Sequence, residues 1–159
     1  MNSSLQSRIL IIDDDLTLIK LTTAILSTNG YEVLSSSEAP VGLEMAMKEN
    51  VDLIVLDVMI PIINGFNICR LLKSQEKYKN IPIVLLTSRS EEEDRKIGKE
   101  VGADAYIAKP FRLEDLLSTL AMLEGNGLIP PQISKENAAG QQQAHWPSRK
   151  DEEVRTSRV

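Results

Sequence analysis

The sequence is poor in the residues that build disulfides and soft-metal centres. Its 159 residues include one Cys and one His, so Cys69 has no second cysteine in the chain with which to form a disulfide. Two such residues cannot supply the ligand spacing of a haem, zinc or iron–sulfur site either. The chain does not open with a charged-then-apolar leader or a long apolar run. We therefore expect a reducing, cytoplasmic setting and no membrane association.

An excess of basic residues is also missing. The 18 Lys and Arg residues are outnumbered by 23 Asp and Glu residues, which gives a formal net charge of -5. A nucleic-acid-binding face needs a basic patch or stripe, so we expect no direct contact with nucleic acid. The hydrophobic content of 42% and the length together suit one well-buried domain and are insufficient for two.

The composition divides the chain into one domain with two flanks. Residues 1–7 are polar, and we expect them to be disordered. The domain is predicted to span residues 8–124. Residues 125–159 contain Pro-Pro, Gln-Gln-Gln and mixed charges without apolar periodicity, which predicts a disordered or loosely attached tail. His145 and Trp146 lie in that tail, where the lone His is expected to be exposed.

Four short apolar segments each end at a residue that can carry charge or donate a hydrogen bond. Segments of this kind are typical of strands buried on both faces in a parallel sheet. The four are Arg8–Ile12 before Asp13-Asp14-Asp15, Val51–Leu56 before Asp57, Ile81–Leu86 before Thr87, and Ala105–Ala108 before Lys109. Because ligands of open parallel sheets bind at the carboxyl ends of the strands, these side chains are predicted to meet at one edge.

Helical patterns separate the strands. Helix starts and stops are indicated by Asp13–Asp15, by Ser37 with Pro40, and by the turns at Asn29-Gly30 and Asn64-Gly65. The first predicted helix is Leu16–Thr28, with the apolar stripe Leu18, Leu21 and Ile25, and the second runs from Ser37 to about Asn50, with Val41 and Met45 on one face. A third helix has the stripe Ile68, Leu71 and Leu72, a fourth runs from Glu91 to about Val101, and a fifth has the stripe Leu113, Leu116, Leu117 and Leu120. A second strand is predicted at Tyr31–Ser35. The fourth helix has Gly98 in its interior, so it is expected to be the least firmly docked.

Five strands alternating with five helices predict a doubly wound α/β fold, because parallel neighbours require right-handed crossovers. A flavodoxin-like three-layer sandwich with parallel sheet order 2-1-3-4-5 is one of the two common solutions. In that order the first and third strands flank the switch point. Asp13, Asp14 and Asp57 would then converge on one cleft.

Three carboxylates in one cleft either raise a pKa or hold a hard cation. All-oxygen ligands suit Mg²⁺, which commonly shares a phosphate. Lys109 and Thr87 would add a positive charge and a hydroxyl, so this set could support phosphoryl transfer to Asp57. Each residue alone also has a plain interpretation. Asp13–Asp15 could cap a helix, and Asp57 could be a turn residue at the end of a strand. Thr87 could be an ordinary strand residue, and Lys109 a surface lysine. The joint placement in chain order favours the site.

The motifs as a set resemble the receiver domain of response regulators in two-component signalling. They are Ile-Ile-Asp-Asp-Asp at 11–15, Leu-Asp-Val-Met-Ile-Pro at 56–61, Leu-Thr-Ser at 86–88 and Gly-Ala-Asp-Ala-Tyr-Ile-Ala-Lys-Pro-Phe at 102–111. The resemblance covers roughly residues 8–123 and is greatest to the receivers of winged-helix transcription regulators. It implies a signalling switch that catalyses only its own Mg²⁺-dependent phosphorylation and dephosphorylation.

The resemblance implies a role for each site residue. Asp57 would accept a phosphoryl group from a histidine kinase or a histidine phosphotransfer protein. The ligands of Mg²⁺, or of Mn²⁺ in its place, would be Asp13, Asp14, Asp57 and the Met59 backbone carbonyl, with Asp13 acting through water. Lys109 would pair with the phosphoryl group, and the bond to Pro110 would be cis.

Thr87 and Tyr106 match the family's switch pair, and the resemblance implies that they act on the face made by the fourth helix, fifth strand and fifth helix. That face would signal to an output protein that the sequence does not identify. It could also form a weak homodimer, although Ala105 and Thr119 stand where related receivers have an acid and an arginine that form a salt bridge. Asn64 replaces the usual Asp of the loop, with little loss expected.

Two residues are expected to set the lifetime of the phosphorylated form. Met59 and Arg89 would flank the line of attack of water, and neither offers a carboxylate or amide to orient it, which predicts slow self-dephosphorylation. The main alternative is a protein-interaction module that keeps the fold without phosphorylation. A phosphatase would need a second acid at the position of Met59, and a flavin carrier would need a phosphate-binding loop after the first strand. The sequence has neither, so both alternatives are disfavoured.

Overall fold

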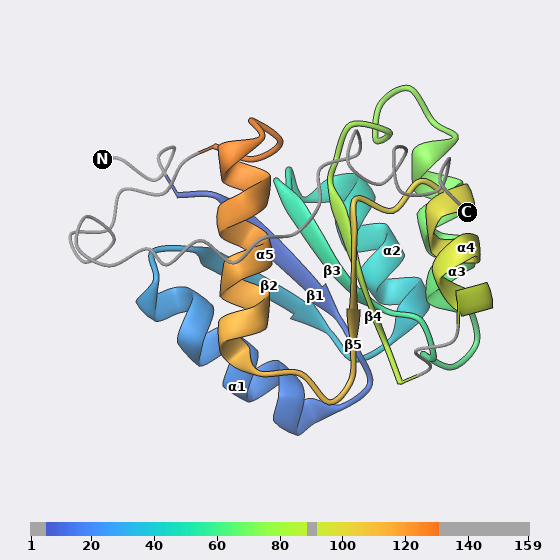
Figure 1. The fold of residues 1–159 in the computed structure, drawn as a ribbon. Coiled ribbons are helices and arrows are strands. Elements are labelled where there is room, and N and C mark those ends of the chain that lie inside the picture. The colour runs from blue at the N-terminus through green and yellow to red at the C-terminus, as the bar shows by residue number, and fades with distance from the viewer. Residues whose placement is uncertain (1–5, 89–91, 131–159) are drawn as a thin grey trace, which may run out of the picture.

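The computed structural model describes residues 6–88 and 92–130. Within them, five parallel strands form one sheet in the order β2-β1-β3-β4-β5, which confirms the predicted fold (Figure 1). The strands are β1 Arg8–Ile12, β2 Glu32–Ser36, β3 Leu53–Asp57, β4 Ile83–Thr87 and β5 Ala105–Ala108. The helices are α1 Leu16–Thr28, α2 Ala39–Lys48, α3 Gly65–Lys73, α4 Glu92–Glu100 and α5 Leu113–Gly125.

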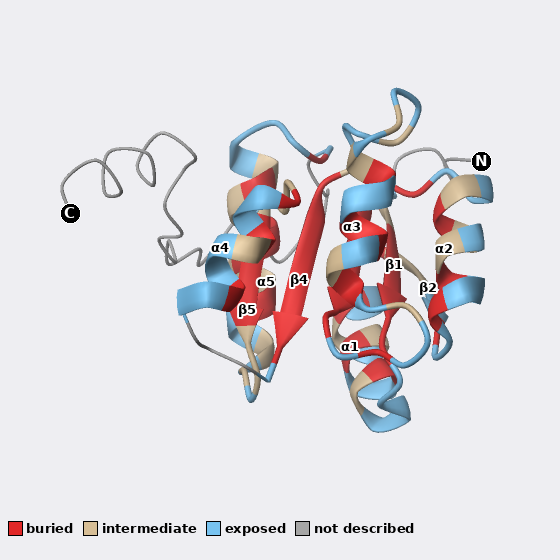
Figure 2. Cartoon of the chain, turned by 90° about the vertical axis from the view of Figure 1, so that its right-hand side faces the viewer, coloured by how far each residue is buried: buried red, intermediate tan, exposed pale blue. Residues whose placement is uncertain are grey.

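The sheet is the middle of three layers. Helices α1 and α5 cover one face, and α2, α3 and α4 cover the other (Figure 1). Alternate residues of each strand enter the two cores: Leu10 of β1 packs with α2 and α3, whereas Ile9 and Ile11 pack with α1 and α5. Strands β3 and β4 are buried along their whole length, as their unbroken apolar runs predict, and Figure 2 shows this for β4.

The register of the sheet brings the strand ends to one edge. Ile12 of β1 lies beside Leu56 of β3, and Thr87 of β4 lies beside Ala108 of β5. Two backbone hydrogen bonds extend this order past the strands, because Asp13 N donates to Ser36 O at 3.1 Å and Lys109 N donates to Thr87 O at 2.6 Å. The residues that follow the strands are therefore held close together.

The faces of three helices differ from the predicted stripes. Leu21 of α1 is 57% exposed, Val41 of α2 43% and Leu71 of α3 42%. The residues that α1 buries are Ile19, Thr22 and Leu26, and those that α3 buries are Gly65, Ile68, Cys69 and Leu72. Thr22 can join the buried face because its hydroxyl donates to the backbone carbonyl of Leu18, one turn earlier. A stripe drawn through aliphatic residues alone therefore predicts the wrong buried face for α1.

The start of one helix and the bounds of one strand are also corrected. The N-cap residue of α2 is Glu38 rather than Ser37, and its side chain makes no capping hydrogen bond. Ser36 is the hydroxyl that stabilises this turn, because its Oγ donates to Glu38 O and accepts from Glu38 N. Strand β2 is shifted one residue later than predicted, which explains the later start of the helix.

The packed region extends beyond the predicted domain boundaries at 8 and 124. Ile129 is 2% exposed within the core beneath α1 and α5, and Leu128 N donates to Leu123 O at 2.9 Å. Ser7 is also buried, and its Oγ donates to Pro130 O at 3.3 Å. The first residues after α5 thus belong to the domain. The predicted disorder at 1–5 and 131–159, including His145 and Trp146, falls outside the described residues.

No helix in the described part of the chain is long and apolar enough to cross a membrane.

Candidate functional site at the carboxyl edge of the sheet

Three carboxylates meet where β1 and β3 end. Ligand oxygens of Asp13, Asp14 and Asp57 all lie within 4.8 Å of one another, as the sheet order predicted. Asp13 is fully buried and Asp57 is 3% exposed, whereas Asp14 faces solvent. Asp15 belongs to a different function, because its side chain caps α1 by accepting from Thr17 N and Leu18 N. Within this acidic run, Asp13 and Asp14 therefore belong to the carboxylate cluster, and Asp15 caps α1.

The ammonium group of Lys109 lies near both buried carboxylates, Asp13 and Asp57. Lys109 Nζ lies 2.8 Å from Asp13 Oδ2 and 3.6 Å from Asp57 Oδ2. Burial lowers the pKa of Lys109, but the hydrogen bond and charge of Asp13, with the charge of Asp57, outweigh burial and raise it. Lys109 therefore stays charged and holds Asp13 more closely than Asp57.

The surroundings of Asp57 oppose the ionisation of its carboxyl group. Burial and the neighbouring charge of Asp13 raise its pKa from 3.8 to about 6, against the opposing effects of Lys109 and of the hydrogen bond from Met59 N. That amide donates to Asp57 Oδ1 at 3.1 Å. The other carboxylate oxygen, Asp57 Oδ2, faces the ammonium group of Lys109. Its environment is that of a reactive group rather than of a solvated turn residue.

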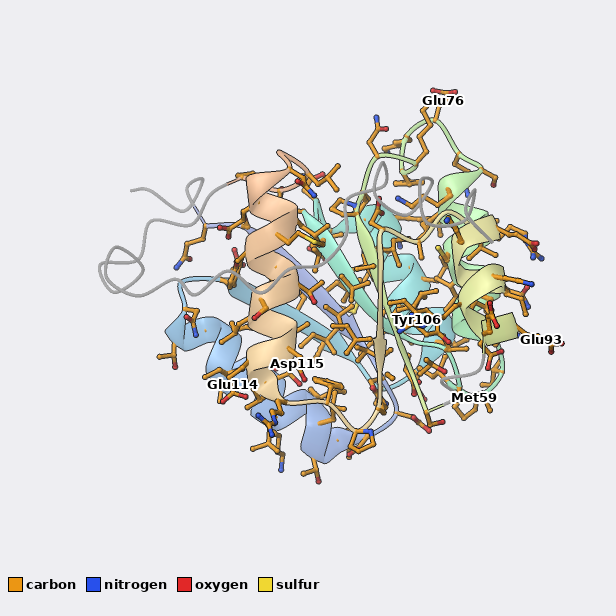
Figure 3. All side chains as sticks on the ribbon, viewed as in Figure 1. Met59, Glu76, Glu93, Tyr106, Glu114 and Asp115 are labelled. Carbon is orange, nitrogen blue, oxygen red and sulfur yellow. The ribbon has the colours of Figure 1, made fainter. Side chains whose placement is uncertain are left out.

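A hydroxyl and a phenol complete the edge on the β4 and β5 side. Thr87 is fully buried and Tyr106 is 8% exposed. Burial raises the pKa of Tyr106, and a hydrogen bond with the Thr87 side chain lowers it. Figure 3 shows Tyr106 between β5 and α4, on the side of the sheet that α4 covers. The two residues are thus already in contact.

The loop after β3 contains two features that sequence reasoning missed. Ile62 has a φ of 77° and is 87% exposed, an uncommon backbone state for a β-branched residue. Gly65 was recognised only as part of a turn, but a Cβ there would lie 2.5 Å from Asp57 O. Gly65 N also donates to Val58 O at 2.9 Å, so the start of α3 packs directly on the backbone at the end of β3. No pattern in one sequence signals the first feature.

Three further predicted site residues are placed as follows. The side chain of Met59 is 49% exposed and lies at the carboxyl edge of the sheet (Figure 3). The Lys109–Pro110 peptide bond is cis, as the resemblance implies. Arg89 lies outside the described residues.

The acidic cluster has the composition of a site for a hard divalent cation. Its donors are all carboxylate oxygens, one of them solvent-facing, and Mg²⁺ prefers a few carboxylates together with retained waters. Lys109 compensates only part of the charge of the two buried acids. The residues present therefore fit such an ion.

The fold and the cluster together define a doubly wound α/β domain with an acidic cluster at its switch point. Residues 9–121 match the response regulator receiver domain family, and the chain belongs to that family. Its members are phosphorylated on an aspartate by histidine kinases, bind Mg²⁺ at an acidic pocket, and act as signalling switches rather than as classical enzymes.

Named relatives support the same assignment. The chain is 34% identical over 134 residues to the alkaline phosphatase synthesis transcriptional regulatory protein PhoP of Bacillus subtilis, covering 84% of this chain and 55% of that protein. It is 40% identical over 116 residues to the response regulator MprA of Mycobacterium leprae, covering 73% of this chain and 50% of that one. The chain thus spans about half the length of these relatives.

Among solved structures, the chemotaxis response regulator CheY4 of Vibrio cholerae superposes with a TM-score of 0.71 at 33% identity. The match covers 74% of this chain and 98% of that one.

Proposed function

We propose that Asp57 is the residue that accepts the phosphoryl group, from the phosphohistidine of a histidine kinase or of a histidine phosphotransfer protein. The observation that carries this proposal is the position of Asp57, a buried carboxylate at the end of β3 with Lys109 Nζ 3.6 Å away. Family membership supplies the reaction class. The chain would catalyse only its own phosphorylation and dephosphorylation, and the proposed setting is the cytoplasm.

In the transfer step an oxygen of Asp57 forms a bond to phosphorus while the bond from phosphorus to the histidine nitrogen breaks. The electron pair of the broken bond stays on the imidazole. Lys109 is near enough to pair with the transferred group, and charge stabilisation together with positioning is the main requirement of phosphoryl transfer. The Met59 amide holds Asp57 Oδ1, which fixes the orientation of the carboxylate.

The proposed ligands of Mg²⁺ are Asp13, Asp14, Asp57 and the backbone carbonyl of Met59, and Mn²⁺ offers the same chemistry. When bound, the ion would neutralise the carboxylates and the incoming phosphoryl oxygens. Asp13 is held between Asp15 N, which donates to its Oδ1 at 2.9 Å, and Lys109. That anchoring keeps one ligand in place before the ion binds.

The proposed switch consists of Thr87 and Tyr106. Thr87 would move toward the phosphoryl group, and the ring of Tyr106 would follow inward, biasing the α4-β5-α5 face between two states. The output partner is a protein that recognises this face. A weak homodimer through it would lack one salt bridge, because Ala105 and Thr119 are both buried and uncharged.

The test is intact-mass spectrometry after incubation with acetyl phosphate and Mg²⁺. We expect one phosphoryl adduct on the wild-type chain and none on Asp57→Asn. Glu76→Gln is the matched control, since Glu76 is an exposed acid at the opposite end of the molecule (Figure 3), and it should form the adduct normally. A folded wild-type protein that forms no adduct, from acetyl phosphate or from any kinase supplied, would overturn the proposal in favour of an unphosphorylated interaction module.

A further inference from the structure

Gly98 lies in the interior of α4, where a glycine weakens the helix relative to alanine. Its backbone is helical rather than left-handed, so alanine could adopt the same conformation. Gly98 is nevertheless buried. The reason for a glycine here must therefore be sought in what surrounds the missing side chain.

The neighbour of Gly98 is the ring of Tyr106. A Cβ on Gly98 would lie 3.2 Å from Tyr106 Cδ2, and 3.4 Å from both Tyr106 Cε2 and Leu85 Cδ1. The contact of 3.2 Å is tighter than ordinary van der Waals contact and requires a shift of a few tenths of an ångström, whereas contacts of 3.4 Å lie at the limit of the ordinary range. Leu85 is fully buried in the central sheet, and its contact is not the tight one. The ring, at the boundary of β5 and α4 (Figure 3), is the group that can be displaced.

Other groups hold the ring where it is. The Thr87 side chain bonds the Tyr106 hydroxyl, and the guanidinium carbon of Arg95 lies 6.0 Å from the ring centroid, within the range of a cation–π contact. Arg95 and Gly98 both belong to α4, so the same helix supplies the cation and the position without a side chain beside the ring. The ring, which is 8% exposed, lies against Gly98 where a side chain on that residue would compete with it for space.

We infer that Gly98 is a positioning residue of the switch, because its missing side chain leaves the space that the Tyr106 ring occupies when it is turned inward. This inference rests on the proposed switching role of Thr87 and Tyr106. A methyl group at this position would move the ring toward solvent and disfavour the inward state. Since phosphorylation and the inward ring would favour each other, a residue that opposes one also opposes the other.

The first measurement follows the ring directly. The full chain is labelled with 3-fluorotyrosine, and the ¹⁹F resonance of Tyr106 is assigned by its loss in Tyr106→Phe. We expect Gly98→Ala to increase the relaxation of this resonance by a soluble paramagnetic chelate several-fold. The matched control is Gly125→Ala in α5, where a Cβ would meet nothing within 4 Å, and it should leave the resonance unchanged.

A second measurement separates packing from helix propensity. Replacing glycine by alanine inside a helix raises the folding equilibrium constant about fivefold when nothing else changes. We expect that gain for Gly98→Ala in a Tyr106→Ala background, where the ring is gone, and its loss in the wild-type background. Urea unfolding of the four proteins gives the comparison, and it remains informative even if Tyr106→Ala lowers stability.

The third measurement links the ring to phosphorylation. With limiting acetyl phosphate and Mg²⁺, Gly98→Ala should form less adduct than Gly125→Ala. The inference is overturned if the Tyr106 relaxation matches wild type and the fivefold gain appears in both backgrounds. Absence of adduct from the wild type would refute the proposed function instead, while the relaxation and unfolding results would still decide whether Gly98 positions the ring.

Discussion

Removing the charge of Asp57 is expected to stabilise the protein at neutral pH. The pKa of Asp57 rises from 3.8 to about 6 on folding because of burial and the charge of Asp13, so the folded state resists its ionisation. Each pKa unit corresponds to about 1.4 kcal/mol. Asp57→Asn should therefore raise the free energy of unfolding by about 3 kcal/mol at pH 7.5. The Asn side-chain oxygen can still accept the hydrogen bond from Met59 N.

The sign of the pH dependence follows from the direction of the shift. A carboxyl group with a raised folded pKa keeps its proton longer in the folded than in the unfolded chain, so stability falls as pH rises from about 4 to about 6. Below that window Asp57 is protonated in both states and contributes no penalty. The advantage of Asp57→Asn should thus shrink to about 1 kcal/mol at pH 4.5.

Urea unfolding in the absence of divalent cations, at pH 7.5 and at pH 4.5, measures both values. Comparing the variant with the wild type at each pH cancels the titration of every other group that the substitution does not touch. Glu76→Gln removes the same charge from a side chain that is 89% exposed, so its difference from wild type should be small and independent of pH. Equal stabilities of Asp57→Asn and wild type at pH 7.5, or a difference that does not shrink at pH 4.5, would refute the reasoning.

Three further predictions concern the same edge of the sheet. Lys109→Met leaves Asp13, which is fully buried, without its cation and should lower the free energy of unfolding at pH 7.5 by about 3 kcal/mol or more in urea unfolding. Ile62→Gly relieves the backbone strain of φ 77° and should raise the free energy of unfolding by about 0.5–1 kcal/mol after the entropy cost of glycine. A lower free energy of unfolding in this variant would show that Ile62 packs favourably. Met59→Asn combined with Arg89→Glu should shorten the half-life of the phosphorylated form, followed by intact mass, and an unchanged half-life would count against the slow-hydrolysis hypothesis.

The fold could be predicted from sequence because four of the five strands are short apolar runs followed by a charged or hydroxyl residue. Such runs as Leu53–Asp57 and Ile83–Thr87 bury both faces, and parallel strands with crossover helices admit few topologies. Since all carboxyl ends of a parallel sheet point the same way, the convergence of Asp13, Asp57 and Lys109 followed from order alone. The geometry of the site was therefore the most predictable part.

Helix faces were less predictable because a stripe can be drawn through the aliphatic residues in more than one way. In α1 the sequence favours Leu21 as a core residue, but the helix buries Thr22, whose hydroxyl is satisfied by the Leu18 carbonyl. In α4 the interior Gly98 indicates weak docking by propensity alone. Its burial against Tyr106 depends on a contact between segments that no local pattern encodes.

The charge balance of the pocket connects its stability to its function. Two buried carboxylates and one exposed one face a single ammonium among the described residues, and that ammonium lies closer to Asp13, at 2.8 Å, than to Asp57, at 3.6 Å. A pocket selected for stability alone would pair both buried acids or protonate one of them. The charge on Asp57, which Lys109 compensates only in part, instead costs folding free energy that a ligand able to neutralise it would return. The carboxyl group whose ionisation the folded domain opposes is thus one that a cation and a phosphoryl group would neutralise.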